Sequence, residues 1–345
     1  MKASHYNFFF PYEADDSKMI AYNSFSNALA LMEKDQYSRF NDFVKNGIDI
    51  DDEEFIQQLK QGSFLQEDAM DELAHLRLRM LQSRYQTRSL SLTIAPTADC
   101  NFRCPYCYEK DFLCNKYMSE ELQQKIIDMV KSHARSISNL GIAWYGGEPL
   151  MAIDIIEKLS REFIRICEEH DIDYTATMVT NGYFLTRKNA ELLRELKVSS
   201  IQITVDGAKE VHNTRRPLAD GSGTFDTIME NMREAKELLP SVNLRINVDM
   251  DNIDSAKDVI DVVAQYGLGE NVFPYLGRIL PDNGEYESSR CFDTCGFSEV
   301  EFDHYMENLD DKSLLWKYPR TTSNVCAADS INSLIIAADG RIYKC

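Results

Sequence analysis

Three of the nine cysteines are spaced so that they could share one inorganic cofactor. Cys100, Cys104 and Cys107 form the pattern C-x3-C-x2-C on a short segment that directly follows a strand-like run. Four cysteine thiolates saturate a cubane iron–sulfur cluster, as in electron carriers. Three thiolates leave one iron free to bind a small molecule. The spacing therefore predicts an open 4Fe–4S site on this loop.

Zinc and uncoordinated thiols are the alternatives for these cysteines. Cys114 would extend the pattern to C-x3-C-x2-C-x6-C, but that spacing is unusual for a structural zinc site with four closed ligands. Reactive thiols without a metal are the other alternative. The strand before the loop and the aromatic Tyr106 before the third cysteine favour the open cluster over both.

Two later segments carry side chains suited to a charged ligand. Gly146 and Gly147 allow the backbone to approach a ligand where a side chain would block it. Glu148 can accept hydrogen bonds from an ammonium group. Thr204 offers a hydroxyl at an inward strand position, and Arg216 can form a forked contact with a carboxylate. Alone, each segment also fits an ordinary turn, but beside the cysteine pattern they indicate a ligand site.

Residues 89–280 alternate strand-like and helix-like segments, which predicts a parallel sheet with right-handed crossovers. The expected strands are Ser89–Ala95, Gly141–Tyr145, Tyr174–Val179, Ser200–Val205, Leu244–Asp249 and Asn271–Tyr275. The expected helices are Glu120–Ala134, Ile153–Glu169, Arg187–Leu196, Thr224–Leu239 and Ser255–Tyr266. Cys100, Gly146, Asn181 and Asp206 each follow a strand, so they share one sheet edge. Doubly wound sheets and barrels both place active sites there, and periodicity does not choose between them.

Together these segments resemble the radical SAM superfamily, whose hallmark is C-x3-C-x-aromatic-C. Trp144–Leu150 resembles the Gly-Gly-Glu-Pro segment after the family's second strand, and Thr180–Thr186 resembles the segment after the third. Ile203–Pro217 is similar to the fourth-strand segment of the peptide- and protein-modifying branch. These motifs occur in the family's order within residues 89–280. The resemblance implies an α/β fold with a partial (β/α)6 TIM-like barrel.

The resemblance also implies cofactors and residue roles. In this family a 4Fe–4S cluster and S-adenosyl-L-methionine (SAM) produce a 5'-deoxyadenosyl radical that removes a hydrogen atom from the substrate. By similarity, Glu148 meets the amino group of SAM, and Thr204 meets its ribose or carboxylate. Arg216, or its neighbour Arg215, would hold the SAM carboxylate. Tyr106 resembles the aromatic residue that packs near the adenine.

Residues 1–88 contain no cysteine and have the pattern of a separate α+β module. Asn7–Phe10, Met19–Tyr22 and Ala28–Met32 are short strand-like runs, and helical patterns follow them. This order resembles the winged-helix-like leader-binding module of peptide maturases. Those enzymes modify ribosomally made peptides and often join a Cys sulfur to a carbon as a thioether. The resemblance implies two partners, a precursor peptide with a leader and an electron donor such as flavodoxin or ferredoxin.

Residues 281–345 are loop-rich and end in a predicted hairpin around an Ala-Asp-Gly turn. Cys326 and Cys345 form C-x13-G-x4-C, which resembles the opening of the SPASM/Twitch auxiliary-cluster domain. The resemblance implies that they bind part of an auxiliary 4Fe–4S cluster, with Cys291 and Cys295 as candidate further ligands. The later cysteines of that domain are absent, so we expect a truncated SPASM/Twitch region here and complete auxiliary clusters only in a longer protein.

Two other functions stay open at this point. One is an enzyme similar to anaerobic sulfatase-maturing enzymes, which oxidise a Cys or Ser of a folding protein to formylglycine. Those enzymes typically begin near their cysteine pattern, so the preceding 88 residues count against this alternative. The other is a cluster-binding scaffold or electron carrier without catalytic activity.

Composition narrows the partners further. The 37 Lys and Arg residues against 56 Asp and Glu leave a net charge of −19, which counts against nucleic-acid binding because counterion release needs clustered cations. No apolar run approaches the length of a membrane span. The N-terminus lacks the pattern of a secretion signal. We therefore expect a cytoplasmic protein that does not bind membranes and uses its cysteines for metal or redox chemistry.

Overall fold

The computed structural model describes residues 1–345 except 240, 270, 281–285, 309–317, 319–320 and 323–325. Part of the predicted linker region therefore lies outside the described residues. The chain divides into two compact units, Met1–Tyr85 with Asp311–Ser330 and Gln86–Asp310 with Ile331–Cys345. Each unit has a buried apolar core of its own. The functional division into 1–88, 89–280 and 281–345 stays a prediction.

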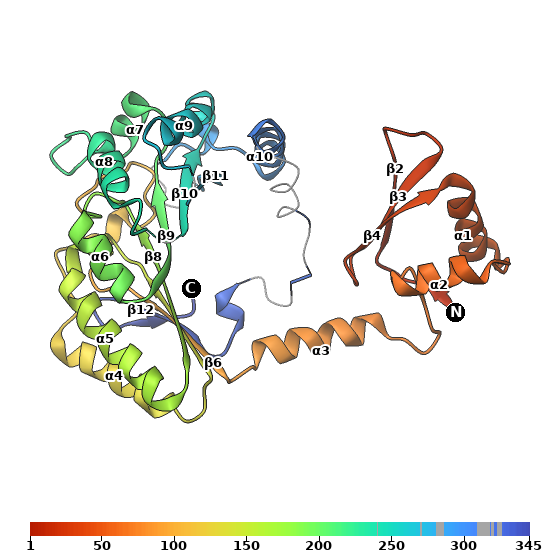
Figure 1. Ribbon diagram of the computed structural model, residues 1–345, viewed down its shortest axis with the longest axis horizontal. Helices are drawn as coiled ribbons and strands as arrows, with labels where there is room; N and C mark the ends of the chain where they lie inside the picture. Colours follow the sequence, from red (N-terminus) through yellow and green to blue (C-terminus); the bar gives the residue numbers. More distant parts are fainter. Residues whose placement is uncertain (240, 270, 281–285, 309–317, 319–320, 323–325) are drawn as a thin grey trace. The chain divides into compact units, whose positions relative to one another are not determined.

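The larger unit is built on one sheet, whose described strands lie in the order β11-β10-β9-β8-β7-β6-β12-β13 (Figure 1). From β6 to β11 the strands pair in parallel and in chain order, as the predicted partial barrel requires. Their bounds are β6 Ser89–Ile94, β7 Asn139–Trp144, β8 Asp173–Thr180, β9 Val198–Thr204, β10 Ser241–Val248 and β11 Val272–Arg278.

The predicted C-terminal hairpin extends this sheet at its other edge. β12 (Ser333–Ile336) pairs in parallel with β6, and β13 (Ile342–Tyr343) pairs antiparallel with β12. Gly340 has a φ of 87° in the turn between them, a backbone conformation that glycine adopts without strain. The hairpin therefore packs beside the strand that leads into the cysteine loop.

Helices connect the parallel strands, and Figure 1 shows α4, α5, α6 and α8 along one face of the sheet. The sequence pattern did not predict two further helices, α7 and α10. The helices of this unit are α4 Glu120–His133, α5 Ile153–His170, α6 Arg187–Glu195, α7 Lys209–Arg215, α8 Phe225–Ala235, α9 Ile253–Gln265 and α10 Thr294–Asn308. Short 3-10 turns occur at Lys110–Phe112, Pro149–Ala152, Ser288–Arg290 and Ala327–Asp329.

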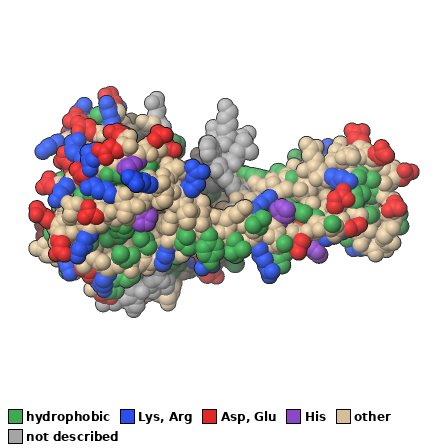
Figure 2. Space-filling view, turned by 90° about the horizontal axis from the view of Figure 1, so that it is seen from below, with side chains coloured by type: hydrophobic (Ala, Val, Ile, Leu, Met, Phe, Trp, Pro, Cys, Tyr) green, Lys and Arg blue, Asp and Glu red, His purple; other side chains and the backbone are tan. Residues whose placement is uncertain are grey.

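The strands place apolar and polar side chains on opposite faces. In β10, Leu244 and Ile246 are completely buried in the core of the larger unit, while Arg245 and Asn247 line a cavity. Successive side chains of a strand point to opposite faces, so alternation in the sequence sorts the core from the cavity. Acidic and basic side chains are interspersed over the outer surface of this unit, at the left of Figure 2. Within the described ranges, no helix is long and apolar enough to cross a membrane.

The smaller unit contains the predicted N-terminal strands followed by helices. β2 (Asn7–Pro11), β3 (Lys18–Asn23) and β4 (Ala28–Glu33) form an antiparallel sheet in that order. The short strands β1 (Lys2–Ala3) and β5 (Leu65–Gln66) pair separately. The helices are α1 Lys34–Asn46, α2 Glu53–Gln61 and α3 Glu72–Arg84. Asp52 caps α2 by accepting a hydrogen bond from the Phe55 amide.

The two faces of this small sheet differ in burial. Ala21 and Met32 belong to the core that also contains Phe40 of α1 and Leu59 of α2. The other face carries four apolar side chains that are each about half exposed, Phe8 and Phe10 of β2 and Leu29 and Leu31 of β4. They flank Tyr22 and Ile20 of β3, which are their register partners. We call the face formed by these six residues the open sheet face. The Tyr318 ring meets Tyr22 edge-on at 6.2 Å, and its hydroxyl donates to the Asn27 carbonyl at 2.9 Å.

Asn23 joins several segments of the smaller unit. Its side-chain amide donates to the Ser4 hydroxyl, the Asn7 side chain and the Ser63 carbonyl, at 2.7–3.1 Å. Its side-chain oxygen accepts hydrogen bonds from the Phe25 and Ser26 amides. Because Asn23 is completely buried, water cannot readily replace it as the acceptor for the buried Phe25 amide. The Ser4 hydroxyl and the Ser63 carbonyl have further partners in Glu72 and Gln66.

We expect Asn23→Ala to destabilise the smaller unit by about 2–3 kcal/mol, because it removes the acceptor of the Phe25 and Ser26 amides and leaves a cavity at a buried position. Hydrogen exchange of the β3 amides in the whole chain measures this loss. The control is Asn46→Ala, since Asn46 is exposed and bonds only to Asp42 in its own helix. Equal exchange rates in the two variants would contradict the structural role of Asn23.

Candidate functional site

The three predicted cysteines come together around one small cavity. Cys100, Cys104 and Cys107 all line a cavity of about 250 Å³ in the loop between β6 and α4. Gly147, from the loop after β7, closes its other side. Three thiols around one confined space are the donor set that an open iron–sulfur cluster needs.

Close backbone contacts hold this loop against the one that follows β7. A Cβ atom at Gly147 would lie 2.2 Å from the Asp99 carbonyl oxygen, and one at Gly146 would lie 2.6 Å from that of Thr97. The Glu148 amide donates to the Asp99 carbonyl at 2.8 Å. These contacts give the paired glycines a second physical reason besides the predicted approach to a ligand.

The cysteine loop is also attached to the chain beyond α7. The Arg103 amide donates to the Pro217 carbonyl, and the Ala219 amide donates to the Asn101 carbonyl, both at 2.9 Å. Asn181 after β8 donates its side-chain amide to the Asn101 side chain at 2.8 Å. The loop is therefore held by segments that follow different strands.

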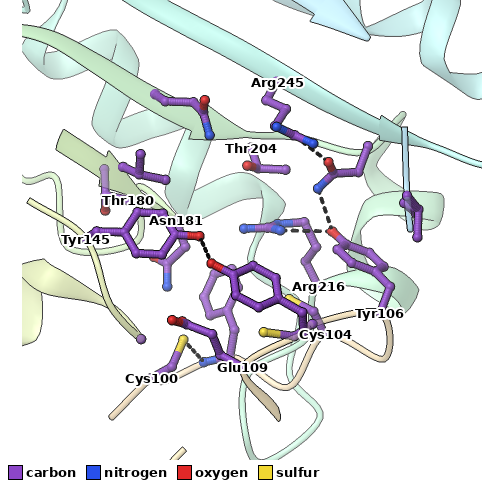
Figure 3. Close-up of a pocket in the computed structure, with 18 of the residues that line it drawn as sticks. Cys100, Cys104, Tyr106, Glu109, Tyr145, Thr180, Asn181, Thr204, Arg216 and Arg245 are labelled. Atoms are coloured by element: carbon purple, nitrogen blue, oxygen red, sulfur yellow. Dashed lines mark hydrogen bonds between the residues drawn. The ribbon is translucent and has the colours of Figure 1, made fainter. Parts of the chain in front are cut away.

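A larger cavity of about 440 Å³ adjoins the small one, and we call it the inner cavity. All three cysteines line it as well, and so do Gly146, Gly147, Tyr106, Thr204 and Arg216 from the predicted ligand site. Figure 3 shows Cys100, Cys104, Tyr106 and Arg216 around this space. The structure therefore brings these predicted residues together.

Tyr106 is fixed by hydrogen bonds at its hydroxyl. The hydroxyl donates to the Asp206 carboxylate, and it accepts from Arg216 at 2.9 Å and from the Asn247 side chain at 3.3 Å. Burial raises the pKa of Tyr106 well above its usual range, so the phenol stays protonated. Asp206 also accepts from the Asn247 amide, so it joins the segment after β9 to β10.

The neighbouring arginines Arg215 and Arg216 have different environments. Arg215 lies 3.0 Å from the Asp249 carboxylate and 3.7 Å from that of Asp206, so buried acids neutralise it. Arg216 lines the inner cavity beneath the Phe102 ring, 5.5 Å from its centre. Its Nε is buried and has no hydrogen-bond partner among the described residues. Arg215 also has two buried nitrogens without a hydrogen-bond partner, but it is not among the described residues that line the inner cavity. Arg216 is thus the arginine placed to serve a ligand there.

Glu148 is placed differently from the other predicted ligand residues. It is completely buried and is not among the described residues that line the inner cavity. Its carboxylate accepts hydrogen bonds from the Leu150 amide, the Thr180 hydroxyl and the Asn181 amide, at 2.7–2.9 Å. In this arrangement Glu148 ties the end of β7 to the end of β8, and its contact with SAM stays a prediction.

Burial affects the thiols of the cysteine loop directly. It raises the pKa of Cys100 to about 12 and that of Cys104 to about 11, and it raises the pKa of Cys107 in the same direction. Without a cation the loop therefore holds neutral thiols. A bound metal would supply the positive charge that favours thiolates there despite burial.

The other cysteines lie elsewhere. Cys114 and Cys345 line a cavity of about 680 Å³ beside the β12–β13 hairpin. Cys326 falls in the smaller unit and Cys345 in the larger one, so their predicted shared cluster stays a prediction. Cys295 is exposed in α10. Over the described ranges, no group of three or more His, Cys, Asp or Glu side chains could hold a single metal ion.

Several residues of the inner cavity were not predicted. They include Tyr108 and Glu109 of the cysteine loop, Gln202 of β9, Arg245 of β10 and Arg278 of β11. Gln202 lies between the buried Ile201 and Ile203 of β9, and Arg245 lies between the buried Leu244 and Ile246 of β10. That alternation was visible in the sequence and could have identified them. The hydroxyl groups of Tyr108 and Tyr145 share a hydrogen bond.

Comparison with known sequences gives a domain match and a curated relative. Residues 94–263 match the sequence model described as the radical SAM superfamily. A protein of Clostridium novyi named cysteine-type anaerobic sulfatase-maturating enzyme is 31% identical over 157 residues, which cover 42% of this chain. The match spans 40% of that relative, so the chain corresponds to less than half of its length.

Solved structures share the fold at low sequence identity. The enzyme anSMEcpe, solved with bound AdoMet and the Cp18Cys peptide, matches with a TM-score of 0.58, 21% identity and 74% coverage of each chain. SuiB of Streptococcus suis, solved with the precursor peptide SuiA, matches with a TM-score of 0.54 and 13% identity over 100% of this chain and 83% of SuiB. At these identities the similarity establishes the fold.

We expect Gly147→Ala to displace the cysteine loop, because the new methyl group would overlap the Asp99 backbone. Overpacking of this kind typically costs about 1–3 kcal/mol. Thermal unfolding and the iron content after anaerobic reconstitution measure the effect, and both should fall. Gly269→Ala is the control, since a Cβ atom there meets open space. An unchanged iron content in Gly147→Ala would show that the contact does not position the cysteines.

Proposed function

Because this chain belongs to the radical SAM superfamily, we propose that it modifies a ribosomally made precursor peptide. The family uses a 4Fe–4S cluster and SAM, and the chain is accordingly a radical SAM enzyme. The observation that carries the proposal is the combination of an open three-cysteine site with a separate N-terminal unit that has its own core. The first feature supports catalysis, and the second supports recognition of an extended substrate.

The residues present fit the cofactors of the family. Cys100, Cys104 and Cys107 would hold the cluster, and the unpartnered Nε of Arg216 is available for the SAM carboxylate. Thr204 lines the inner cavity and offers its hydroxyl there. When bound, the two groups supply the abstraction of a hydrogen atom from a substrate carbon.

The chain's own residues bind and orient the ligand, and they exclude water from the site. The Phe102 ring is buried and Tyr106 is half-buried, and each ring has an arginine over its face. The hydrogen bonds to the Tyr106 hydroxyl hold that ring in one position beside Arg216. Gly146 and Gly147 line the inner cavity without side chains that would fill it. A rigid wall of this kind can keep a substrate C–H bond in a fixed position.

The smaller unit is the proposed recognition module for the leader of the precursor. Its antiparallel sheet has β2 and β4 as edge strands, and a leader can add to such an edge as a further strand. The open sheet face beside those edges presents apolar side chains that an amphipathic leader could cover. The alignment of SuiB over the whole chain is consistent with this module order.

Three finer points belong to the same proposal. The bond formed is a thioether between a Cys sulfur and a carbon of the peptide. Cys326 and Cys345 contribute to auxiliary 4Fe–4S cluster binding. Reducing equivalents come from a small electron carrier such as flavodoxin or ferredoxin.

Maturation of a sulfatase is the second candidate function. The Clostridium novyi relative, named as a sulfatase-maturating enzyme, favours it by sequence identity. That match covers 42% of this chain, and the N-terminal unit is the feature that favours a leader-bearing peptide instead. The two functions differ in substrate and in product.

The experiment that tests the function uses the whole chain, reconstituted with iron and sulfide without oxygen. With SAM and dithionite we expect 5'-deoxyadenosine, and its yield should rise with a Cys-containing precursor peptide encoded beside the gene. Mass spectrometry should show that the peptide loses two hydrogen atoms, and removal of its leader should reduce the yield. Formylglycine in a sulfatase-derived peptide, with no change in any precursor, would replace the proposal by the second candidate.

The control for this experiment is a set of cysteine variants. Replacing Cys100, Cys104 and Cys107 together by Ala should abolish 5'-deoxyadenosine formation and remove the iron of that site. Cys114→Ala should do neither, because Cys114 lines a different cavity. Cleavage of SAM by the triple variant would refute the assignment of the cluster to this loop.

Arg215 and Arg216 provide a matched pair of substitutions. We expect Arg216→Ala to weaken SAM binding by about 1.5–3 kcal/mol, because it removes a charge-assisted bond to a carboxylate. Arg215→Ala should instead lower stability by about 3–5 kcal/mol, because it leaves Asp206 and Asp249 buried without their cation. Titration with SAM and thermal unfolding measure the two effects. If SAM affinity were lost only in Arg215→Ala, Arg215 would be the SAM ligand and Arg216 the structural residue.

A further inference from the structure

Arg245 is a cation on the inner face of the sheet that the roles proposed so far do not use. It lies on β10 between the buried Leu244 and Ile246, and it lines the inner cavity. Figure 3 shows Arg245 on the side of the cavity away from Cys100 and Cys104. Its position therefore differs from that of Arg216, whose guanidinium bonds to Tyr106 of the cysteine loop.

Residues of two neighbouring strands, β10 and β11, determine where the Arg245 guanidinium lies. Its Nε donates to the side-chain oxygen of Asn247 at 2.7 Å, and Asn247 in turn donates to the Tyr106 hydroxyl. Gly277 on β11 is the register partner of Asn247. A Cβ atom at Gly277 would lie 2.5 Å from Nε and 2.9 Å from one terminal nitrogen of Arg245. The guanidinium thus occupies the space that a side chain at position 277 would fill.

The charges around the inner cavity are unbalanced. Among its described lining residues, Arg216, Arg245 and Arg278 are cationic, and Glu109 is the one acid. Within the described part of the chain, no ion pair joins Arg245 to a carboxylate, whereas Arg215 has Asp206 and Asp249. SAM brings a single carboxylate, for which Arg216 is the proposed partner. The guanidinium of Arg245 can therefore bind a second anion near β10 and β11.

We propose that Arg245 binds a carboxylate of the substrate beside the reacting residue. A guanidinium whose Nε is already fixed presents its terminal nitrogens in one orientation, and such a group binds carboxylates with defined geometry. The carboxylate is an Asp or Glu side chain of the peptide or its C-terminal carboxylate. This inference rests on the proposed function in that it takes the substrate to be a peptide.

The test measures how the reconstituted whole chain, with SAM present, retains short peptides in equilibrium dialysis. One pool has a central Asp or Glu and an amidated C-terminus, a second is neutral with a free C-terminal carboxylate, and a third is neutral and amidated. We expect wild type to retain the first or the second pool over the third, and the preferred pool identifies the source of the carboxylate. Arg245→Gln should reduce that preference on the order of tenfold.

Gly277→Ala tests the geometry without removing the charge. The added methyl group must displace the guanidinium of Arg245, so the preference for the carboxylate pool should fall here as well. Gly141→Ala on β7 is the matched control, because a Cβ atom there meets its nearest neighbours at an ordinary 3.7 Å. Its preference should equal that of wild type.

Three outcomes would overturn the inference. The first is equal retention of all pools by wild type, and the second is an unchanged preference in Arg245→Gln. The third is a loss of SAM affinity in Arg245→Gln as large as the loss of peptide retention, because Arg245 would then hold the SAM carboxylate. Modification of a precursor is read separately from product mass, so failure of the proposed function is distinguishable from failure of this inference.

Discussion

The site depends on the close backbone contact between the cysteine loop and the loop after β7. Gly146 and Gly147 lie against Thr97 and Asp99 at distances that leave no space for a Cβ atom. The parallel pairing of β6 with β7 brings the two loops to the same sheet edge. Because the cysteines follow Asp99 directly, the geometry of the thiols is determined by this contact.

Three arginines of the larger unit differ in whether a carboxylate neutralises their charge. Arg215, Asp206 and Asp249 form a buried set in which opposite charges compensate for lost hydration. Arg216 and Arg245 face the inner cavity with hydrogen bonds to neutral partners, Tyr106 and Asn247. Their positive charges are therefore available to anionic ligands. Tyr106 connects both groups, since its hydroxyl bonds to Asp206, Arg216 and Asn247.

The smaller unit follows a different physical principle, in which a thin sheet is buried on one side only. Its core forms between the sheet and the helices α1 and α2, around Phe40, Phe55 and Leu59. The open sheet face keeps apolar side chains in contact with water, at a cost that a bound peptide would remove. Leu73 and Met80, which have helical spacing in α3, are also exposed, so their apolar pattern does not mark a core position.

The sequence by itself determined the order of strands and helices, the cysteine loop and the sheet edge that carries it, because spacing and periodicity are local properties. Its motifs also predicted Tyr106, Thr204 and Arg216 as ligand residues, and the structure brings all three to the inner cavity. Only the tertiary structure decided that Glu148 bonds to Thr180 and Asn181, and that Arg215 is neutralised while Arg216 faces the cavity. It alone showed that Arg245 occupies the space left by Gly277. Each of these facts depends on a partner from another strand or loop, and the direction of a side chain follows from that partner rather than from its neighbours in the chain.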